Sequence, residues 1–351
     1  MTAARIPVTL LTGFLGSGKT TLLNAWVKQP AFARSLIIVN EFGDVALDHL
    51  LVAHSADQTV VELPGGCLCC TVRGDLQKTL LDARWRFARG GQRQFDRVLI
   101  ETTGLADPAP IINTLAANDP LARHYQWQGV VTTVDAGQGE ATLKRFAEAR
   151  RQVAFADLVL ITKADETGTA AIDSLIGEIR TRNPSAAMLP ISLPPIDEVA
   201  RNRLFSALTA VTMGDAQPLN QVDDTTGLRI RKIHPVRIPE AGETPHADAD
   251  AMTSFSWVSD QPVASEKLAA WWAFVQTHAN ERLLRLKALV RTTEKPEPQL
   301  MQIVQHRVHP TITLADWPTP DHRSRIIAIG ESSVVDKLAN ATKALESAPA
   351  V

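Results

Sequence analysis

Cysteine is scarce in this sequence: there are three in 351 residues, and all of them lie between positions 67 and 70. This clustering excludes a framework of disulfides spread over a secreted domain, so we expect the thiols to form one site. Long apolar runs are also lacking, since the run from Ile6 to Leu11 is far shorter than the roughly 20 residues of a membrane-spanning helix. Residues 1–5 contain no basic region followed by a secretory apolar region. These absences predict a cytoplasmic protein that does not enter a membrane.

An excess of charge of either sign is missing as well. The 36 Lys and Arg residues nearly balance the 38 Asp and Glu residues, which leaves a formal net charge of -2. Such a chain has no global attraction to nucleic acid or to an anionic membrane, so neither is expected as a partner. The hydrophobic share of 45% is typical of globular proteins, and 351 residues are too many for one ordinary core. Two domains are therefore expected.

Short β-branched runs alternate with helical stretches from the start of the chain to about residue 210. This alternation predicts an α/β fold with a mostly parallel sheet and helices on both faces. The predicted strands are nearly continuous in apolar residues, as strands buried on both faces should be. They are Val8–Leu11, Leu36–Val39, Thr59–Leu63, Val98–Ile100, Val130–Val134 and Leu158–Ile161.

The composition changes after residue 212. Residues 213–227 lack periodicity and are rich in Gly, Pro, Asn and Asp, which predicts a linker between a first domain at 1–212 and a second at 228–346. The second domain is expected to be a smaller α+β unit, followed by a loose tail at 347–351. Its predicted strands are Phe255–Val258, Leu284–Val290, Leu300–Gln305 and Ile326–Ile329, and its predicted helices are Ser265–Ala279 and Ser333–Leu345.

A glycine-rich loop follows the first predicted strand and precedes a helical stretch. It reads Gly13-Phe14-Leu15-Gly16-Ser17-Gly18-Lys19-Thr20, the spacing of a P-loop. The glycines let backbone N–H groups surround phosphate oxygens, and the start of the helix adds partial positive charge. Lys19 is expected to reach the β and γ oxygens, while the Thr20 hydroxyl ligates Mg²⁺. The loop therefore predicts a P-loop NTPase.

A P-loop enzyme also needs a carboxylate at the end of a neighbouring strand, to hold Mg²⁺ or its water ligands. Glu101 follows Val98–Ile100 and meets this need. By itself it is equally well explained as an exposed acid at a strand end, and the P-loop favours the functional interpretation. Gly104, three residues later, is placed to approach the γ-phosphate.

The identity of the base is predicted from the loop after Leu158–Ile161, which reads Thr162-Lys163-Ala164-Asp165. A carboxylate at Asp165 can accept both N–H groups of the guanine Watson–Crick edge, whereas adenine presents one acceptor and one donor there. The Lys163 stem can lie along the plane of the base. Guanine is favoured, although such a short pattern also fits a solvated loop.

The three thiols, Cys67, Cys69 and Cys70, follow two glycines in a turn. Spacing of i, i+2 and i+3 lets two or three sulfurs point at one centre, and soft thiolates suit Zn²⁺ or another late transition metal. Three ligands leave a fourth position of a tetrahedral ion open, as in sites of catalytic or transferable metal. Buried inert thiols and a redox pair are the alternatives. Glu41, after another predicted strand, is a possible extra ligand or a switch residue on the Mg²⁺ side.

These motifs together resemble the CobW-type metallochaperone GTPases, with the bacterial YjiA-like branch the most similar. Their order and spacing both match, and the resemblance continues into the second domain. The segments that carry it are the P-loop with its Thr20-Thr21 tail, Asn40–Gly43, Gly66–Cys70, Glu101–Pro108, Thr162–Asp165, Arg282–Ala288 and Gln302–Val308.

The resemblance implies a slow GTPase that binds Zn²⁺, Co²⁺ or a similar ion and couples its nucleotide state to metal delivery. It implies a client metalloprotein or an enzyme of a metal-cofactor pathway as the recipient, and often a homodimer. Carried over to this sequence, phosphate binding extends to Thr21, Mg²⁺ is held by Thr20 and Glu101, and guanine is read by Asp165. Asp48 and Glu101 are both candidates for activating the attacking water.

The sequence departs from the family pattern at several positions. Thr162 replaces the usual Asn of the guanine loop and so lacks one contact to the purine edge. Asp44 and Ala46 stand where relatives often have Glu and Gly. The histidine-rich tract of many relatives is absent, which argues against storage of several metal ions.

Two other functions remain as alternatives. The chain can be a nucleotide-dependent regulatory switch whose metal is purely structural, in which case removal of the metal unfolds the first domain. It can also be a zinc hydrolase that uses the open metal position on a small substrate. The hydrolase ranks last, because no His or Glu is spaced as a general base.

Overall fold

The computed structural model describes residues 5–40, 59–62, 71–89, 92–117, 119–193, 198–213, 227–233, 252–304, 306–314, 316–317 and 321–346. These residues fall in two compact units. One comprises Met1–Ile176 and Ala187–Gln217, and the other comprises Gly177–Ala186 and Pro218–Val351. The inclusion of residues 177–186 in the second unit was not expected from the sequence. The linker at 213–227 stays a prediction, since 214–226 lie outside the described residues.

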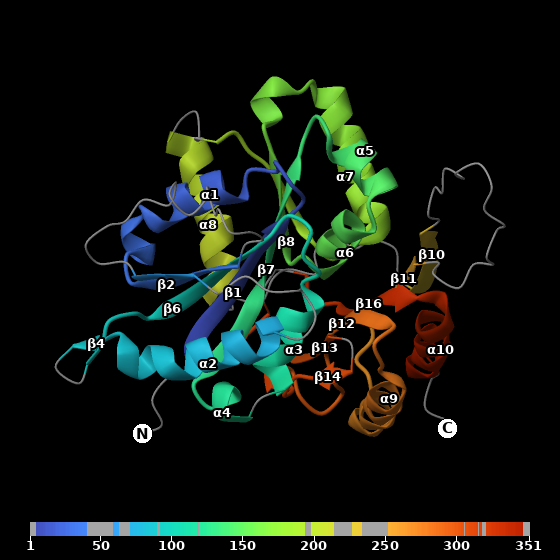
Figure 1. Cartoon of the computed structure of the whole chain (residues 1–351). Helices are drawn as coiled ribbons and strands as arrows, with labels where there is room; N and C mark the ends of the chain where they lie inside the picture. The colour runs from blue at the N-terminus through green and yellow to red at the C-terminus, as the bar shows by residue number, and fades with distance from the viewer. Residues whose placement is uncertain are drawn as a thin grey trace, which may run out of the picture. The chain divides into compact units, whose positions relative to one another are not determined.

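The first unit is built on a seven-stranded sheet in which every pair of neighbours is parallel (Figure 1). Its order is β3-β2-β6-β1-β7-β8-β9. The strands are β1 (Ile6–Gly13), β2 (Ser35–Asn40), β3 (Thr59–Glu62), β6 (Arg97–Thr102), β7 (Tyr125–Asp135), β8 (Leu158–Thr162) and β9 (Ala187–Pro190). The six predicted strands are thus confirmed. The edge strand β9 was missed because its four side chains are only partly buried or exposed, so it has no fully buried apolar run.

Helices cover both faces of this sheet, as predicted. Helices α1 (Lys19–Val27) and α8 (Glu198–Met213) share one core with it, in which Trp26 and Leu204 pack with Leu99 of β6. Along the strand order, the connection from β1 to β2 steps towards β3, whereas the connections β3–β6, β6–β7 and β7–β8 step towards β9. Right-handed connections therefore place the helices of these three on the face opposite to α1. The helices of these and the following crossover are α2 (Thr71–Arg86), α3 (Ala109–Ala117), α4 (Asp119–Ala122), α5 (Gly139–Arg145), α6 (Ala147–Phe155) and α7 (Thr169–Arg182).

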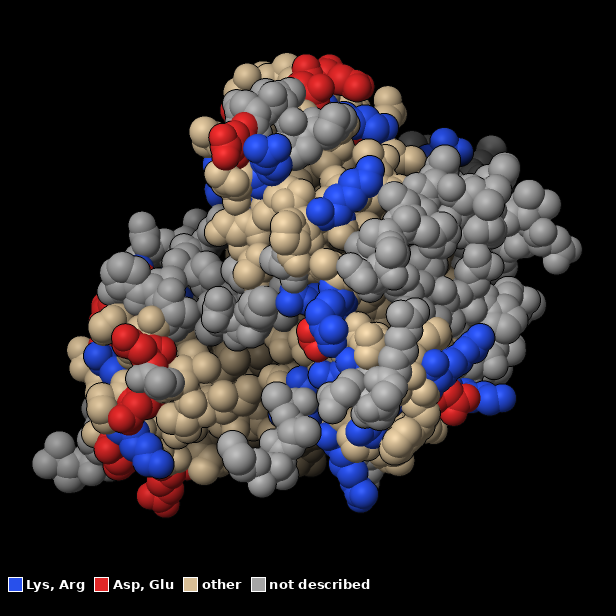
Figure 2. Space-filling view, turned by 90° about the vertical axis from the view of Figure 1, so that its left-hand side faces the viewer, with Lys and Arg blue, Asp and Glu red and all other residues tan. Residues whose placement is uncertain are grey.

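A short hairpin of β4 (Ala88–Arg89) and β5 (Gln92–Arg93) follows α2. Asp96 pairs there with Arg34 at 2.6 Å and with Arg93 at 3.7 Å. Figure 2 shows the side that lies at the left of Figure 1, where β4 is found; basic side chains gather near its middle, and most of the acidic ones lie at the lower left and at the top. These exposed pairs contribute little to stability individually.

The second unit is an antiparallel sheet with two helices, in agreement with the predicted α+β domain. Its strand order is β10-β11-β16-β12-β13-β14, and β15 also pairs with β13. Trp257 and Trp271 lie in the core between this sheet and its helices. The strands are β10 (Gly227–Ile233), β11 (Met252–Ser259), β12 (Leu283–Val290), β13 (Gln299–Val304), β14 (Arg307–Val308), β15 (Ile312–Thr313) and β16 (Ser324–Glu331), and the helices are α9 (Ser265–His278) and α10 (Ser332–Thr342).

None of the helices in the described ranges combines the length and the apolarity needed to cross a membrane. The predicted tail at 347–351 lies outside those ranges.

Candidate functional site

The parallel order brings the predicted nucleotide-binding motifs to one edge of the first sheet. The P-loop follows the central strand β1, and Glu101 lies opposite Leu11 on the neighbouring β6. On the other side, Asp135 at the end of β7 lies opposite Thr162 at the end of β8. In open α/β sheets, ligands bind outside the carboxyl ends of the strands. The register therefore collects phosphate, magnesium and base motifs at the edge where a ligand is expected.

The P-loop has a backbone that side chains would obstruct. Its φ angles are 143° at Gly13, 71° at Gly16 and 87° at Gly18, all in the region that favours glycine. A Cβ on Gly13 would also collide with the side chain and carbonyl of Thr133 on β7. The hydroxyls of Ser17 and Thr133 are 2.7 Å apart, so the loop is fixed to the neighbouring strand.

Helix α1 begins at Lys19 without a side-chain cap and without an acid in its first turn. The N–H groups at this helix start are therefore not neutralised by a capping carboxylate, which suits an anionic ligand. The Lys19 ammonium donates to the carbonyl oxygens of Gly13 at 3.0 Å and Phe14 at 3.3 Å. The Lys19 ammonium thus lies at the P-loop, where it is predicted to contact phosphate.

Thr20 and Glu101 meet directly. The Thr20 hydroxyl donates to Oε1 of Glu101 at 2.9 Å, and Glu101 is 5% exposed. Mg²⁺ takes oxygen ligands and commonly keeps several water ligands, so a hydroxyl and a carboxylate in contact beside the P-loop fit this ion. These two residues are the ones predicted to hold it.

Gly104 lies against the P-loop. A Cβ on Gly104 would come within 2.7 Å of the Leu15 backbone nitrogen and 2.8 Å of its Cα, so a larger residue does not fit. Thr102, at the end of β6, donates its hydroxyl to Thr12 of β1 at 2.8 Å. The segment after β6 is therefore held close to the phosphate loop.

The predicted base loop is also attached to the P-loop. Thr162 is 1% exposed, and its hydroxyl donates to the Ser17 carbonyl at 2.9 Å. Lys163 has a left-handed backbone with φ of 55°, and its ammonium donates to the Gly16 carbonyl at 3.1 Å. Asp165 is exposed. The Thr162 side chain thus faces the P-loop backbone, and Asp165 is the residue of this loop that is open to a ligand.

Asp135 is a residue of this site that the sequence analysis did not identify. Its Oδ2 lies 2.6 Å from the Lys163 ammonium, and its Oδ1 accepts the N–H groups of Gly137 at 2.9 Å and Gln138 at 3.0 Å. Its position directly after the predicted strand Val130–Val134 could have identified it as a site residue. Glu101 was recognised from the same kind of position.

The predicted metal ligands Cys67, Cys69, Cys70 and Glu41 and the candidate base Asp48 lie outside the described residues. In the chain, Glu41 directly follows β2, and the cysteines lie between β3 and α2. Strands β2 and β3 are parallel neighbours in the sheet of β1, so both strands end at the same sheet edge as the strand that precedes the P-loop. Within the described ranges, no cluster of three His, Cys, Asp or Glu side chains is arranged to hold a metal.

Two family models match the chain. The model of the CobW/HypB/UreG nucleotide-binding domain matches residues 7–190, and that of the cobalamin synthesis protein cobW C-terminal domain matches residues 252–346.

Individual proteins match over nearly the whole length. The chain is 31% identical to the zinc chaperone YjiA of Escherichia coli (strain K12), over 90% of this chain and 89% of that protein. It is 29% identical to the zinc chaperone CobW of Sinorhizobium sp., over 94% and 95% of the two chains. The crystal structure of Zn(II)-bound YjiA GTPase from E. coli superposes with a TM-score of 0.61 at 24% identity, covering 98% of this chain and 100% of that one.

Proposed function

The chain belongs to the CobW/HypB/UreG nucleotide-binding family, and from this we propose that it binds and slowly hydrolyses GTP in order to control a transition-metal ion. Two relatives are named zinc chaperones, and YjiA GTPase has been crystallised with Zn(II). The cargo proposed for this chain is accordingly Zn²⁺, with Co²⁺ or a similar ion as the next candidate.

The contact between Thr20 and Glu101 is the observation that carries the proposal. A hydroxyl whose proton is accepted by a buried carboxylate has its oxygen ready for a cation. Thr20 would supply a ligand to Mg²⁺, and Glu101 would hold the ion or its water. The Lys19 ammonium exchanges the loop carbonyls for the β and γ oxygens, while Gly13, Gly16, Ser17, Gly18 and Thr21 complete the phosphate site.

Guanine selectivity is assigned to Asp165, whose carboxylate is exposed and would accept two N–H groups of the base. Thr162 attaches the base loop to the P-loop instead of contacting the purine. The Lys163 stem lies beside the base while its ammonium keeps the contact with Asp135. Hydrolysis then transfers the γ-phosphoryl group to water, with Glu101 or Asp48 orienting the attacking molecule.

The cargo ion is bound by Cys67, Cys69 and Cys70, with Glu41 as a further ligand. These residues would be brought together around the ion when Mg²⁺-GTP is bound. Loss of the γ-phosphate releases them, as in other nucleotide-dependent segments. Because coupling is reciprocal, the ion changes nucleotide affinity by the same factor.

The recipient is a client metalloprotein or an enzyme of a metal-cofactor pathway, met in the cytoplasm. A homodimer is part of this proposal, and nucleic acid and membrane are not among its partners.

Metal titration in three nucleotide states tests the proposal. Zn²⁺ affinity should differ between protein with a non-hydrolysable GTP analogue, with GDP and without nucleotide, and the Cys69→Ser variant should lose the tight site. Equal Zn²⁺ affinity in all three states would contradict coupling between nucleotide and metal binding. Loss of folded structure on chelation would favour the regulatory switch with a structural metal.

A further inference from the structure

Helix α6 contacts the loop at residues 103–108, which we call the β6–α3 loop. The Gln152 amide nitrogen donates to the carbonyl oxygens of Gly104 and Ala106 at 3.1 Å each, so both of its protons are used. Gln152 is 1% exposed, and the Thr132 hydroxyl of β7 donates to its backbone carbonyl at 3.0 Å. The side chain therefore extends from a helix position that is bonded to the sheet to two carbonyl groups of the loop.

Two buried polar atoms beside this contact have no hydrogen-bond partner within the described ranges. They are Oε1 of Gln152 and Oγ1 of Thr103. Native proteins leave few buried polar atoms unsatisfied, so each one calls for a reason. Turning the Gln152 amide over would point its oxygen at two carbonyls and lose both bonds. The unsatisfied Oε1 is thus the consequence of an orientation that the loop carbonyls require.

Two further contacts join the same helical region to the nucleotide site. Arg151 pairs with Asp107 of the β6–α3 loop at 2.7 Å. Phe146, at the start of α6, stacks on Phe14 of the P-loop with ring centroids 4.5 Å apart. One helix thereby contacts both the phosphate loop and the loop that is predicted to approach the γ-phosphate.

The space beside these contacts permits movement. A cavity of about 230 Å³ borders the P-loop, and its lining includes Leu15, Leu143, Gln152 and Val153. Leu15 is the residue on which Gly104 is packed. Leu15 is also 59% exposed, so a small displacement of its side chain does not require the core to be repacked.

We infer that Gln152 is a positioning residue that holds the β6–α3 loop against the P-loop and so gives the site its preference for nucleoside triphosphate over diphosphate. The inference rests on the proposed nucleotide function. A loop that is held in place loses little conformational freedom when Gly104 meets the γ-phosphate, whereas an unheld loop must be ordered on binding. Diphosphate binding does not use this loop, so it is insensitive to Gln152.

The contact itself is tested in the nucleotide-free protein by hydrogen exchange. Gln152→Met keeps the length of the side chain and removes both donors, and we expect peptides covering residues 103–108 to exchange about tenfold faster than in the unaltered protein. The matched control is Tyr125→Phe, which removes another buried hydrogen bond of this unit, from the Tyr125 hydroxyl to the Leu80 carbonyl at 2.6 Å. Tyr125→Phe should leave exchange at 103–108 unchanged.

The nucleotide preference is tested by the affinities for GDP and for a non-hydrolysable GTP analogue. In Gln152→Met the analogue should bind about tenfold more weakly relative to GDP, with GDP affinity unchanged. If Gln152→Met does not fold, Arg151→Ala takes its place. The Arg151 side chain is half exposed, so its removal leaves the core intact. In Arg151→Ala, the affinity for the GTP analogue relative to that for GDP should also fall, by about twofold to threefold.

Unchanged exchange at 103–108 in the folded Gln152→Met variant, or in Arg151→Ala if that variant is used in its place, would overturn the inference. Faster exchange with an unchanged ratio of the two affinities would overturn it as well. If the unaltered protein binds neither guanine nucleotide, it is the proposed function that fails. The exchange experiment contains no nucleotide, and it then decides alone whether Gln152 holds the loop.

Discussion

The ammonium of Lys163 lies 2.6 Å from the Asp135 carboxylate and 3.1 Å from the Gly16 carbonyl. This one side chain therefore joins the ends of β7 and β8 to the P-loop. The carboxylate is the more buried of the two partners, with 17% of its side chain exposed against 42% for Lys163. The pair fixes the position of a lysine that is predicted to lie along the base.

Asp135→Asn tests this arrangement. It removes the charge but keeps an oxygen for the N–H groups of Gly137 and Gln138, so the turn should survive. Because a partly exposed pair contributes at most about 1 kcal/mol, guanine nucleotide affinity should fall about fivefold. Fluorescence titration measures the fall, and a change of less than twofold would contradict the role of the pair.

Lys19→Ala should abolish measurable nucleotide binding, because it removes the cation that faces the β and γ oxygens. The protein should remain folded by circular dichroism, and its thiols should still react and bind metal. A Lys19→Ala variant that hydrolyses GTP at the normal rate would show that the P-loop assignment is wrong.

Thr20→Ala separates the magnesium site from the phosphate site. It leaves Glu101 in place but removes the proposed hydroxyl ligand, and half-maximal GTP hydrolysis should require about tenfold more Mg²⁺. Thr20→Ser retains the hydroxyl and is the matched control. Identical Mg²⁺ dependence of Thr20→Ala and Thr20→Ser would contradict magnesium binding by this residue.

Gly104→Ala should lower the rate of GTP hydrolysis roughly 100-fold, because its Cβ forces the β6–α3 loop away from Leu15 and misplaces the reacting groups. Gly168→Ala is the control, since a Cβ on Gly168 meets nothing within 4 Å. Steady-state phosphate release compares the two variants. Equal rates for both would argue against close approach of Gly104 to the nucleotide.

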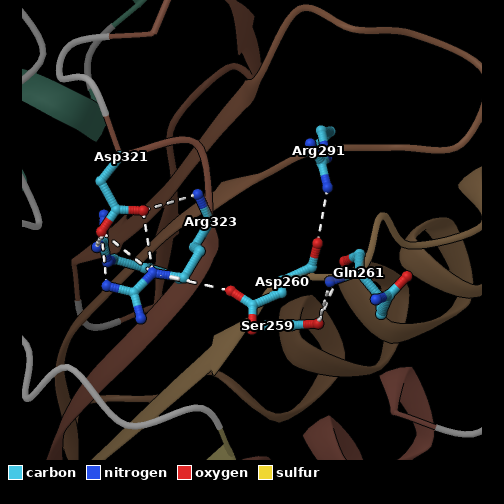
Figure 3. A network of polar contacts seen from close by, with 7 residues as sticks. Ser259, Asp260, Gln261, Arg291, Asp321 and Arg323 are labelled. Carbon is cyan, nitrogen blue, oxygen red and sulfur yellow. Dashed lines mark hydrogen bonds and ion pairs between the residues drawn. The ribbon is translucent and has the colours of Figure 1, made fainter.

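The second unit offers a prediction about pH. Asp321 lies close to Arg323, which also faces Asp260 (Figure 3). Arg325 pairs with the same Asp321 carboxylate. Hydrogen bonds from Arg323 hold the Asp321 pKa well below its ordinary 3.8, against the opposing effect of burial, and Arg325 adds to the lowering. A lowered folded-state pKa stabilises the fold above 3.8, and this stabilisation is lost as the pH falls below that value.

Asp321→Asn should therefore cost about 1 kcal/mol of unfolding free energy at pH 7, a figure kept small because a third of the side chain is exposed. The difference from the unaltered protein should shrink as the pH falls from 4 towards 2. Urea unfolding at several pH values measures it. A cost that stays constant over this range would exclude the ionised carboxylate as its source.

Much of the first unit could be predicted from local sequence. Val8–Leu11, Val98–Ile100 and Leu158–Ile161 are buried, as strands covered on both faces should be, so their apolar runs are continuous. The P-loop spacing leaves little conformational freedom to the loop after β1. The edge strands β9 and β10 were missed. The first has no fully buried run. The second begins where the predicted linker ends, and Arg and Lys residues interrupt its apolar ones.

The contacts around Gln152 were beyond sequence reasoning for a different reason. Gln152 lies 48 residues from Gly104 in the chain, and a single glutamine in a helix normally faces solvent. Its role is created when the β6–β7 and β7–β8 crossovers place their helices on the same face of the sheet. The thiols are the opposite case, because their chemistry is evident from spacing while their arrangement lies outside the described residues.

The bond from the buried Thr162 hydroxyl to the Ser17 carbonyl has a consequence for size selection. It fixes the separation between the loop predicted to grip the base and the loop predicted to grip the phosphates. A guanine nucleoside without phosphates engages one end only, and inorganic phosphate engages the other. Only a molecule of nucleotide length reaches both, so we expect free guanosine to compete weakly with GTP even though it carries the entire base.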